Sequence, residues 1–335
     1  MDETLPNDPH AHLWAEYERL TKNHLQVATV EDIFNCFRLI LGRNPNPEEW
    51  IGHTSRCGED LASVVGSYLS SLEFVRRDLL RPDEGDQPVL TAYDDFKIYT
   101  RPGDLSVGRY IAHHDYEREI QAVFRSHLKP GMAVLDIGAN VGFFTMLSAA
   151  MVGREGRVIA VEPNADNVKL LEASRRENGF EQVQICCFAA SATPGILALN
   201  TSHSNGTTAR PGYSLNQLFS SSIVPALDLD RITSELRVDF VKIDVEGAEY
   251  LALQGLNKTL TRCRPIIVSE FTPNSMQWLS GVSSGDYLRF LQGLGYSISV
   301  IEPDGSATQC HDEAQVMTMF QRRRTDHVDL LMMPE

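Results

Sequence analysis

An acidic, glycine-bearing loop holds the first residues that could do chemistry. An apolar run that contains Asp136 breaks into Gly138, Asn140 and Gly142, and a helical pattern follows. Glycines at a strand-to-helix turn let the backbone approach a ligand closely. A second apolar run ends in Glu162, 26 residues after Asp136, near the ~20-residue offset of a carboxylate that accepts from ribose hydroxyls. This spacing predicts a nucleotide-binding half-site.

The charge of this loop indicates the cofactor. The loop reads D-x-G-x-N-x-G and lacks the G-x-G-x-x-G spacing of nicotinamide-dependent dehydrogenases. Asp136 would repel the pyrophosphate of a dinucleotide, whereas it suits a cationic ligand. S-adenosylmethionine has a ribose, an amino group and a sulfonium, and it has no phosphate. We therefore predict S-adenosylmethionine as the cofactor, with S-adenosylhomocysteine as its product, and disfavour NAD.

Further candidates for acid–base chemistry follow later strands. Asp244 comes at the end of one apolar run, Glu246 lies in the loop after it, and Glu270 ends the next run. Carboxylates that converge at one sheet edge raise one another's pKa, so one of them could act as a general base. His113 and His114 precede a predicted helix in a segment that could cover the site. Either is a candidate base, with His114 preferred, although an exposed loop histidine is the commoner outcome.

The same strand ends could bind a metal ion, and two charged residues lie close to them in the sequence. Asp244 and Glu270 at adjacent strand ends could hold Mg²⁺, which prefers oxygen ligands. The second strand end has one carboxylate and not an Asp pair, so Mg²⁺ is not favoured and no metal ligand is predicted. Lys242 is expected to pair structurally with a carboxylate. Glu249 is expected at a helix N-terminus, which favours acids through its dipole.

Alternating elements must position these residues. Strands are predicted at 133–137, 157–161, 183–188, 238–243, 265–270, 296–301 and 327–332, and helices at 141–152, 164–178, 247–256 and 284–294. Strands separated by helices imply a mostly parallel sheet. The last strand has no predicted helix before it, so an antiparallel direction is expected. Strand-like pieces at 196–200 and 223–227 bracket a polar loop, either a lid over the site or a surface excursion.

The first part of the chain has a different pattern. Helices are expected at Ala11 to Asn23, after the cap Thr29, from Pro47, and from Gly58 to Ser71. A charged segment rich in Pro and Gly, 81–88, is typical of a linker. We therefore predict a helical domain and linker at 1–88 and an α/β domain at 89–335.

The composition of the chain indicates which partners and which cellular compartment are expected. The formal net charge of −15 disfavours a nucleic-acid substrate, which would call for a basic face. No run of 18 apolar residues exists, so no membrane span is expected. The N-terminus is acidic and polar, unlike a secretory signal, and the six cysteines form no C-x-x-C pair. These features predict a cytoplasmic protein with reduced thiols.

Residues 93–305 resemble the FkbM family of S-adenosylmethionine-dependent methyltransferases. The matching strings are Tyr116-Glu117, LKPGMAVLDIGANVGFFT at 128–145, GRVIAVEPN at 156–164, Leu227-Asp228 and VDFVKIDVEGAEYLALQG at 238–255. The resemblance implies a class I methyltransferase (Rossmann-like) fold. Such a fold has helices on both faces of a mostly parallel seven-stranded sheet whose last strand is antiparallel. It also implies O-methylation of a hydroxyl on a sugar, glycoconjugate or polyketide-type metabolite.

The expected cofactor site combines the loop with later strand ends. The residues expected to contact S-adenosylmethionine are Glu117, Asp136, Gly138, Asn140, Gly142, Glu162, Asn164, Ala189, Ala190 and Asp244. Glu162 should bind the ribose with help from Asn164. Ala189 and Ala190 follow the third strand, where enzymes of this class place backbone near the adenine. The resemblance adds Glu117, whose carboxylate would face the amino group, although a surface acid on a helix is the alternative.

The N-terminal part has a weaker resemblance of its own. LILGRNPNPEEWIGH at 39–53, followed by SSLEF at 70–74, is similar to a short helical domain of unknown function that is related in pattern to phycobilisome linker repeats. It implies a stabilising appendage or a protein-docking role. The alternative function is therefore a non-catalytic binding protein that docks through residues 1–88. Methylation of a nucleobase amino group is disfavoured, since no N/D-P-P-Y/F/W string occurs.

Overall fold

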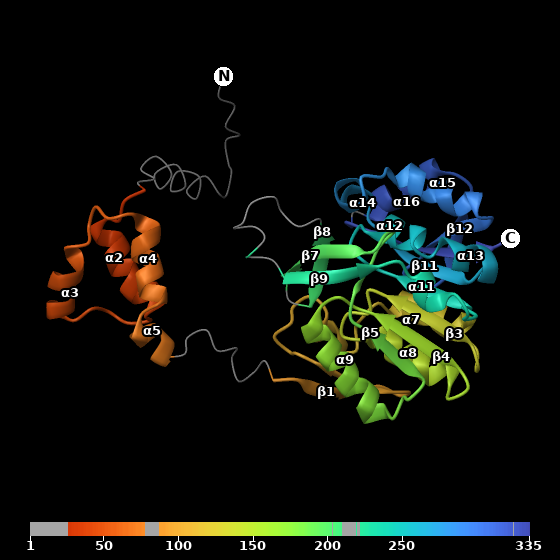
Figure 1. Cartoon of the computed structure of the whole chain (residues 1–335), viewed down its shortest axis with the longest axis horizontal. Coiled ribbons are helices and arrows are strands. Elements are labelled where there is room, and N and C mark those ends of the chain that lie inside the picture. The colour runs from red at the N-terminus through yellow and green to blue at the C-terminus, as the bar shows by residue number, and fades with distance from the viewer. Residues whose placement is uncertain (1–25, 78–86, 203, 210–218, 220–221, 324) are drawn as a thin grey trace, which may run out of the picture. The chain divides into compact units, whose positions relative to one another are not determined.

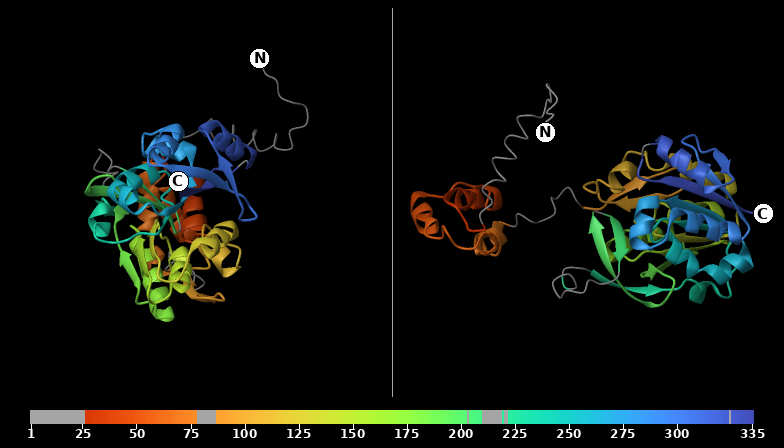
Figure 2. Two further views of the ribbon diagram at one scale, coloured as in Figure 1. Left: turned by 90° about the vertical axis from the view of Figure 1, so that its right-hand side faces the viewer. Right: turned by 90° about the horizontal axis from the view of Figure 1, so that it is seen from above.

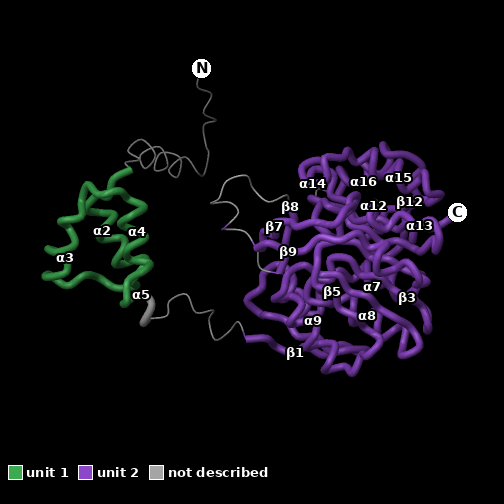
Figure 3. The backbone as a smooth tube through the Cα atoms, in the orientation of Figure 1, with its two compact units in different colours: residues 1–84 green, residues 85–335 purple. Residues whose placement is uncertain are grey.

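A computed structural model describes residues 26–77, 87–202, 204–209, 219, 222–323 and 325–335. The chain divides into two compact units, residues 1–84 and 85–335 (Figure 3). The predicted helix from Ala11 to Asn23 and most of the predicted linker lie outside the described residues.

The first unit is helical. Its elements are α2 (Val30–Asn35), the π-helix η1 (Cys36–Ile40), α3 (Pro47–Thr54), α4 (Leu61–Leu69) and α5 (Leu72–Arg77). Thr29 caps α2 in a reciprocal capping box with Asp32, and Pro47 stands in the first turn of α3, as predicted. Ile33, Phe37 and Val64 are among the residues buried between these helices.

The second unit contains an eight-stranded sheet (Figure 1). Its strands are β3 (Ala133–Ile137), β4 (Arg157–Val161), β5 (Val183–Cys186), β10 (Phe240–Ile243), β11 (Ile266–Phe271), β12 (Tyr296–Ile301), β13 (Ala307–Cys310) and β14 (Val328–Pro334). The order across the sheet is β13-β12-β14-β11-β10-β3-β4-β5. The run from β5 to β11 is parallel, and β14 is antiparallel to both of its neighbours.

Two details of this sheet correct the sequence prediction. The sheet has one strand more than the seven expected, because β13 folds back on β12 as an antiparallel partner. The last strand is antiparallel as expected, yet a helix, α16 (Glu313–Arg323), does precede it. That helix packs Val316, Met319 and Phe320 against the core, and these residues stand at helical spacing, so the sequence carried an apolar pattern for a helix that was not predicted.

Helices cover both faces of the sheet (Figure 2). Alternate residues of β3 point to opposite faces, so Val134 and Leu135 belong to different buried clusters. The cluster of Val134 includes residues of α7 (Arg118–His127), α8 (Phe143–Val152) and α9 (Ala165–Asn178). The cluster of Leu135 includes residues of α12 (Glu249–Gln254), α13 (Asn257–Cys263), α14 (Pro273–Leu279), α15 (Ser284–Gly293) and α16. None of the described helices is long and apolar enough to cross a membrane.

Smaller elements complete the unit. A four-stranded sheet has the order β6-β9-β7-β8, with β6 (Ala189–Ala190), β7 (Gly195–Ser202), β8 (Asn205–Ala209) and β9 (Ser222–Leu227). Both strand-like pieces predicted around the polar loop are therefore strands. Hairpin β1 (Val89–Ala92) and β2 (Lys97–Thr100), and the helices α6 (Gly108–Ala112) and α11 (Asp230–Thr233), make up the rest.

Candidate active site

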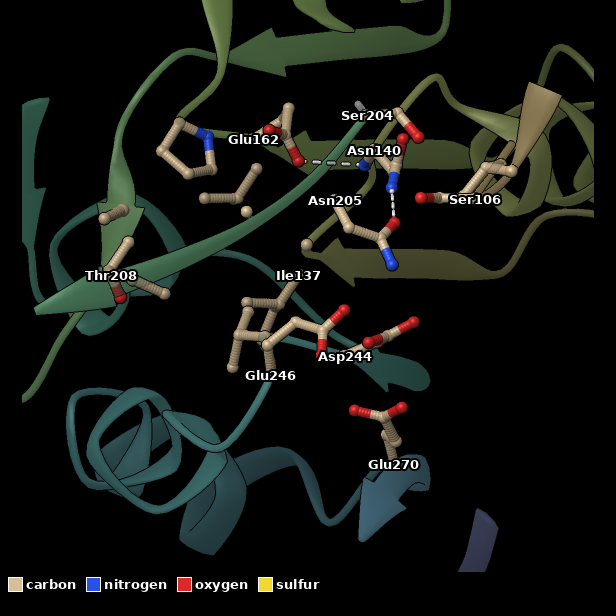
Figure 4. A pocket seen from close by; sticks show the side chains of 18 of the residues that line it. Ser106, Ile137, Asn140, Glu162, Ser204, Asn205, Thr208, Asp244, Glu246 and Glu270 are labelled. Carbon is tan, nitrogen blue, oxygen red and sulfur yellow. Dashed lines mark hydrogen bonds between the residues drawn. The ribbon is translucent and has the colours of Figure 1, made fainter. Parts of the chain in front are cut away.

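A pocket lies at the carboxyl edge of the parallel strands, where open α/β sheets bind ligands. Its volume is about 220 Å³. Glu162 lies at one end, Glu270 at the other, and Asn140 and Asn205 lie between them (Figure 4). The predicted site residues that line it are Glu117, Gly138, Asn140, Glu162, Ala189, Ala190, Asp244, Glu246 and Glu270.

Four predicted site residues, Asp136, Gly142, Asn164 and His114, do not line this pocket. Asp136 is buried behind it, where its Oδ2 accepts from Thr145 Oγ1 over 2.5 Å. Asp136 therefore does not line the pocket, and its expected attraction of the cofactor's amino group, directly or through water, stays a prediction. Asn164 caps α9 with its side chain, and it reaches the site only through its backbone N–H, which donates to Glu162.

The two loop glycines are needed for packing. Gly138 has φ 78°, and a Cβ there would clash with the carbonyl oxygen of Asp244. Its N–H donates to the carbonyl of Val161, and a contact between its backbone and the cofactor stays a prediction. Gly142 has φ 95° and lies against Leu171, whose Cγ would be 2.7 Å from an added Cβ. Gly138 thus lets the end of β3 approach the end of β10, Gly142 lets α8 approach α9, and only Gly138 borders the pocket.

Glu162 is held by donors from the loop and from α9. Its Oε2 accepts from the N–H of Asn140 over 2.9 Å, and its Oε1 accepts from the N–H of Asn164 over 2.8 Å and Asn167 Nδ2 over 3.4 Å. Burial nevertheless raises the pKa of Glu162 to about 7, against these hydrogen bonds. An ionised carboxylate has about four acceptor sites, so Glu162 keeps capacity for a further donor in the pocket.

The hairpin of β7 and β8 contributes one wall of the pocket. Asn140 Nδ2 donates to Asn205 Oδ1 over 3.0 Å, and Asn167 Nδ2 donates to the carbonyl of Ser204 over 2.8 Å. The amide of Asn140 thus contacts β8, and its expected contact with the cofactor stays a prediction. The described part of the polar loop lies against the pocket and is attached to the cofactor loop.

A buried lysine stands beside three carboxylates. Lys242 Nζ donates to Asp244 Oδ2 over 2.9 Å, which confirms the predicted structural pairing. Burial alone would lower the pKa of Lys242, yet the charges of Asp244, Glu117 and Asp136 outweigh it and raise that pKa. Burial raises the pKa of Glu117, and Lys242 opposes this effect. Glu117 therefore belongs to the pocket and not to an exposed helix surface.

The opposite end of the pocket is acidic and carries a histidine. Burial and the charges of Asp244 and Glu246 raise the pKa of Glu270 well above its usual range. Glu270 Oε2 is buried and has no hydrogen-bond partner. His327 and Asp329 also line this end. Neither was predicted, because they lie at the beginning of the last strand, whereas the candidate residues were those that follow the ends of strands.

His114 lies away from this acid–base cluster. It is exposed, and its ring centroid lies 4.4 Å from that of Tyr93. His113 is exposed as well, and its Nδ1 contacts the carbonyl oxygen of Arg109. Both histidines thus have the exposed placement that was expected as the commoner outcome, and their candidacy as the base is corrected. The segment before α7 does reach the pocket, but through Tyr116 and Glu117.

Two local features mark the pocket as a built site. Five described non-glycine residues have positive φ, and three of them, Glu117, Asn140 and Glu246, line the pocket. Such backbone costs of order 1–3 kcal/mol per residue and clusters at functional sites. Glu249 begins α12 as predicted, but its buried carboxylate accepts from the N–H groups of Val245 and Gly247 and so fixes the loop that carries Glu246.

Comparison with known proteins identifies the domain. Residues 136–298 match the family model described as the methyltransferase FkbM domain. The chain carries an FkbM methyltransferase domain. The resemblance to the FkbM family is thus confirmed, and its class I fold agrees with the order β5-β4-β3-β10-β11-β14-β12 and the antiparallel β14. S-adenosylmethionine is the cofactor of this family.

More distant similarities are short or weak. A 56-residue stretch is 52% identical to protein-L-isoaspartate O-methyltransferase 1 of Arabidopsis thaliana and covers 16% of this chain and 24% of that protein. A 39-residue stretch is 49% identical to ribosomal RNA large subunit methyltransferase E of Acidithiobacillus ferrooxidans and covers 11% of this chain and 18% of that protein. The chain thus spans a quarter or less of these curated relatives. The FkbM methyltransferase structure from Methylobacillus flagellatus aligns with 88% of this chain and 58% of that chain, at 14% identity and a TM-score of 0.40.

The FkbM domain has residues that fit its cofactor. Glu162 has remaining acceptor capacity for a ribose hydroxyl, and Ala189 and Ala190 line the same pocket. Glu117 and Asp244 place negative charge where a cationic amino group and a sulfonium would be stabilised. Within the described residues, no group of three or more His, Cys, Asp or Glu has the geometry of a metal site.

Proposed function

We propose that this chain is an S-adenosylmethionine-dependent O-methyltransferase that acts on a hydroxyl of a sugar, glycoconjugate or polyketide-type metabolite. The observation that carries the proposal is the gathering of acid–base groups at one end of the pocket, with Asp244, Glu246, Glu270 and Asp329 beside His327. An alcohol must lose its proton on methylation, and a positioned base supplies typically ~10²–10⁴-fold in rate.

The cofactor would be held by residues of the other end together with Asp244. Glu162 would accept from the ribose hydroxyls, Glu117 and Asp244 would face the amino group, and the backbone of Ala189 and Ala190 would border the adenine. When bound, S-adenosylmethionine supplies a methyl group, and the sulfur retains the electron pair of the broken bond. The protein would then orient the acceptor oxygen and take its proton, so proximity and proton transfer are the two contributions of this chain.

Two binding measurements test the cofactor half. Isothermal titration of the whole chain with S-adenosylhomocysteine should show a single site. Asn205→Ala, which removes the contact with Asn140, should weaken binding several-fold, whereas Thr207→Val in the same strand should not. Absence of binding by the folded wild-type protein would reject the proposal.

The acceptor half needs a chemical readout. Mass spectrometry of cellular glycans and metabolites, with and without the gene, should reveal a species that loses the mass of one CH₂. Asp244→Ala should abolish that species. If Asp244→Ala left the methylated species unchanged, the alternative of a non-catalytic protein that docks through residues 1–88 would be favoured.

A further inference from the structure

The beginning of β14 lies where the parallel strands end. Because β14 is antiparallel to β11, Asp329 stands opposite Glu270, and His327 just before the strand reaches the carboxyl edge. His327 and Asp329 both line the pocket, next to Glu270. One reversed strand thus adds an imidazole to a site whose other acid–base groups follow parallel strands.

Two carboxylates approach the same nitrogen of this imidazole. His327 Nδ1 lies 2.9 Å from Asp326 Oδ1 and 3.7 Å from Glu270 Oε1. The hydrogen bond to His327 lowers the pKa of Asp326, so Asp326 is an ionised carboxylate that can only accept, and Nδ1 carries the proton in this contact. In the neutral ring, Nε2 is then the basic nitrogen. This is the arrangement by which a carboxylate fixes the tautomer of a catalytic histidine.

We propose that His327 is the general base of the methyl transfer, and that Asp326 and Glu270 are positioning residues that keep its proton on Nδ1. This inference rests on the proposed O-methylation. As the acceptor oxygen bonds the methyl carbon, its O–H proton passes to Nε2, and the electron pair of the broken S–C bond remains on sulfur. The imidazolium that forms lies among carboxylates and later releases the proton to water.

The surroundings favour this histidine over the carboxylates as the base. Asp244 Oδ2 is already occupied by Lys242, and Glu246 lies in a left-handed loop position, whereas two acidic side chains approach the ring of His327. Burial lowers the pKa of His327, but the charge of Asp329, the bond to Asp326 and the charge of Asp244 outweigh it and raise the pKa above the usual value. The charged groups that face His327 are Asp244, Glu246, Glu270, Asp326 and Asp329.

The tautomer can be tested without an acceptor. In ¹⁵N-histidine-labelled protein, long-range ¹H–¹⁵N spectra distinguish a protonated from an unprotonated ring nitrogen, and His327→Asn assigns the signal. Above the pKa of His327 we expect a protonated Nδ1 and an unprotonated Nε2. Asp326→Ala together with Glu270→Gln should lower the pKa of His327 and reduce this preference. A protonated Nε2 in the wild type would overturn the proposal.

Kinetics with a methylated acceptor separate this inference from the proposed function. His327→Asn should lower kcat by ~10²–10⁴-fold, lose the decline of kcat toward acid pH, and keep the wild-type affinity for S-adenosylhomocysteine. His311→Asn, at an exposed position, is the matched control. A wild type active on a hydroxyl, with His327→Asn within threefold of it, would overturn the role of His327 and leave the proposed function intact. A wild type that methylates amines and no hydroxyl would overturn both.

Discussion

Lys242 Nζ donates to Asp244 Oδ2 over 2.9 Å from a side chain that is 6% exposed. The two residues stand two positions apart on and just after β10, so their side chains share one face of the strand. The same ammonium is stabilised by the charges of Glu117 and Asp136. One cation therefore joins the segment before α7, the cofactor loop and the end of β10.

Removing this cation should destabilise the second unit. Lys242→Met keeps the length of the side chain but leaves buried carboxylates without their partner, which costs ~3–5 kcal/mol. Urea denaturation of the full chain measures the change. Lys169→Met removes an exposed partner of Asp166 and should cost less than about 1 kcal/mol. If both variants lost the same small amount of free energy of unfolding, the buried Lys242–Asp244 pair would not stabilise the unit as predicted.

Affinity for S-adenosylhomocysteine should depend on pH through Glu162. The pKa of Glu162 is raised to about 7, and its ionised form is the better acceptor for ribose hydroxyls. Affinity should therefore be highest above pH 7 and decline as the pH falls through that value. Glu162→Gln should bind roughly 10–100-fold more weakly at pH 8, as for loss of a charged hydrogen bond of about 1.5–3 kcal/mol, with a flatter pH profile. Titration calorimetry between pH 5.5 and 8.5 tests this, with the exposed Glu155→Gln as control.

The buried Glu249 should make the second unit less stable at neutral pH than at mildly acidic pH. Burial raises the pKa of this carboxyl to about 7 in the folded protein, against a usual value of 4.5. The folded state therefore holds this proton more tightly than the unfolded state, and stability declines as the pH rises from about 4.5 to 7. Between pH 4.5 and 8, Glu249→Gln should gain on the order of 3 kcal/mol relative to wild type. Chemical denaturation at both pH values measures it. A difference that does not change with pH would contradict this, and exposed Glu235→Gln is the control.

The stability of the first unit should fall as the pH falls, which is the opposite of the effect expected for Glu249. Arg43 donates to both carboxylate oxygens of Glu73 and of Glu49, which links the LILGRNPNPEEWIGH and SSLEF strings. The hydrogen bond from Arg43 lowers the pKa of Glu49 to about 2, so this stabilisation is present above about pH 4.5 and is lost as the pH falls toward 2. Arg43→Lys cannot form both bidentate pairs.

Hydrogen exchange of the full chain can follow this unit separately. Arg43→Lys should reduce amide protection within residues 30–77 at neutral pH and leave the second unit unchanged. Arg38→Lys, at an exposed position in the same unit, is the control. Unchanged protection in Arg43→Lys would show that the two strings are held together by packing alone.

Local sequence was sufficient for much of the sheet and for the cofactor loop. The predicted bounds of β3, β4 and β12 agree with the structure, because each is a short apolar run between turn residues. Glu162, Asn140 and Asp244 were expected at the site for a related reason. In a parallel sheet every strand end reaches the same edge, so a polar residue after an apolar run is placed there without further information.

The remaining site residues depended on contacts between distant segments. Asp136 at the end of β3 accepts from Thr145, and Gly142 lies against Leu171, so both are held by contacts that only the packing reveals. His327 follows a polar stretch at the start of a strand, and its place beside Glu270 exists only because β14 runs against β11. Sequence periodicity indicates which face of an element is buried. The direction and the neighbours of that element depend on how all strands and helices pack together around the sheet.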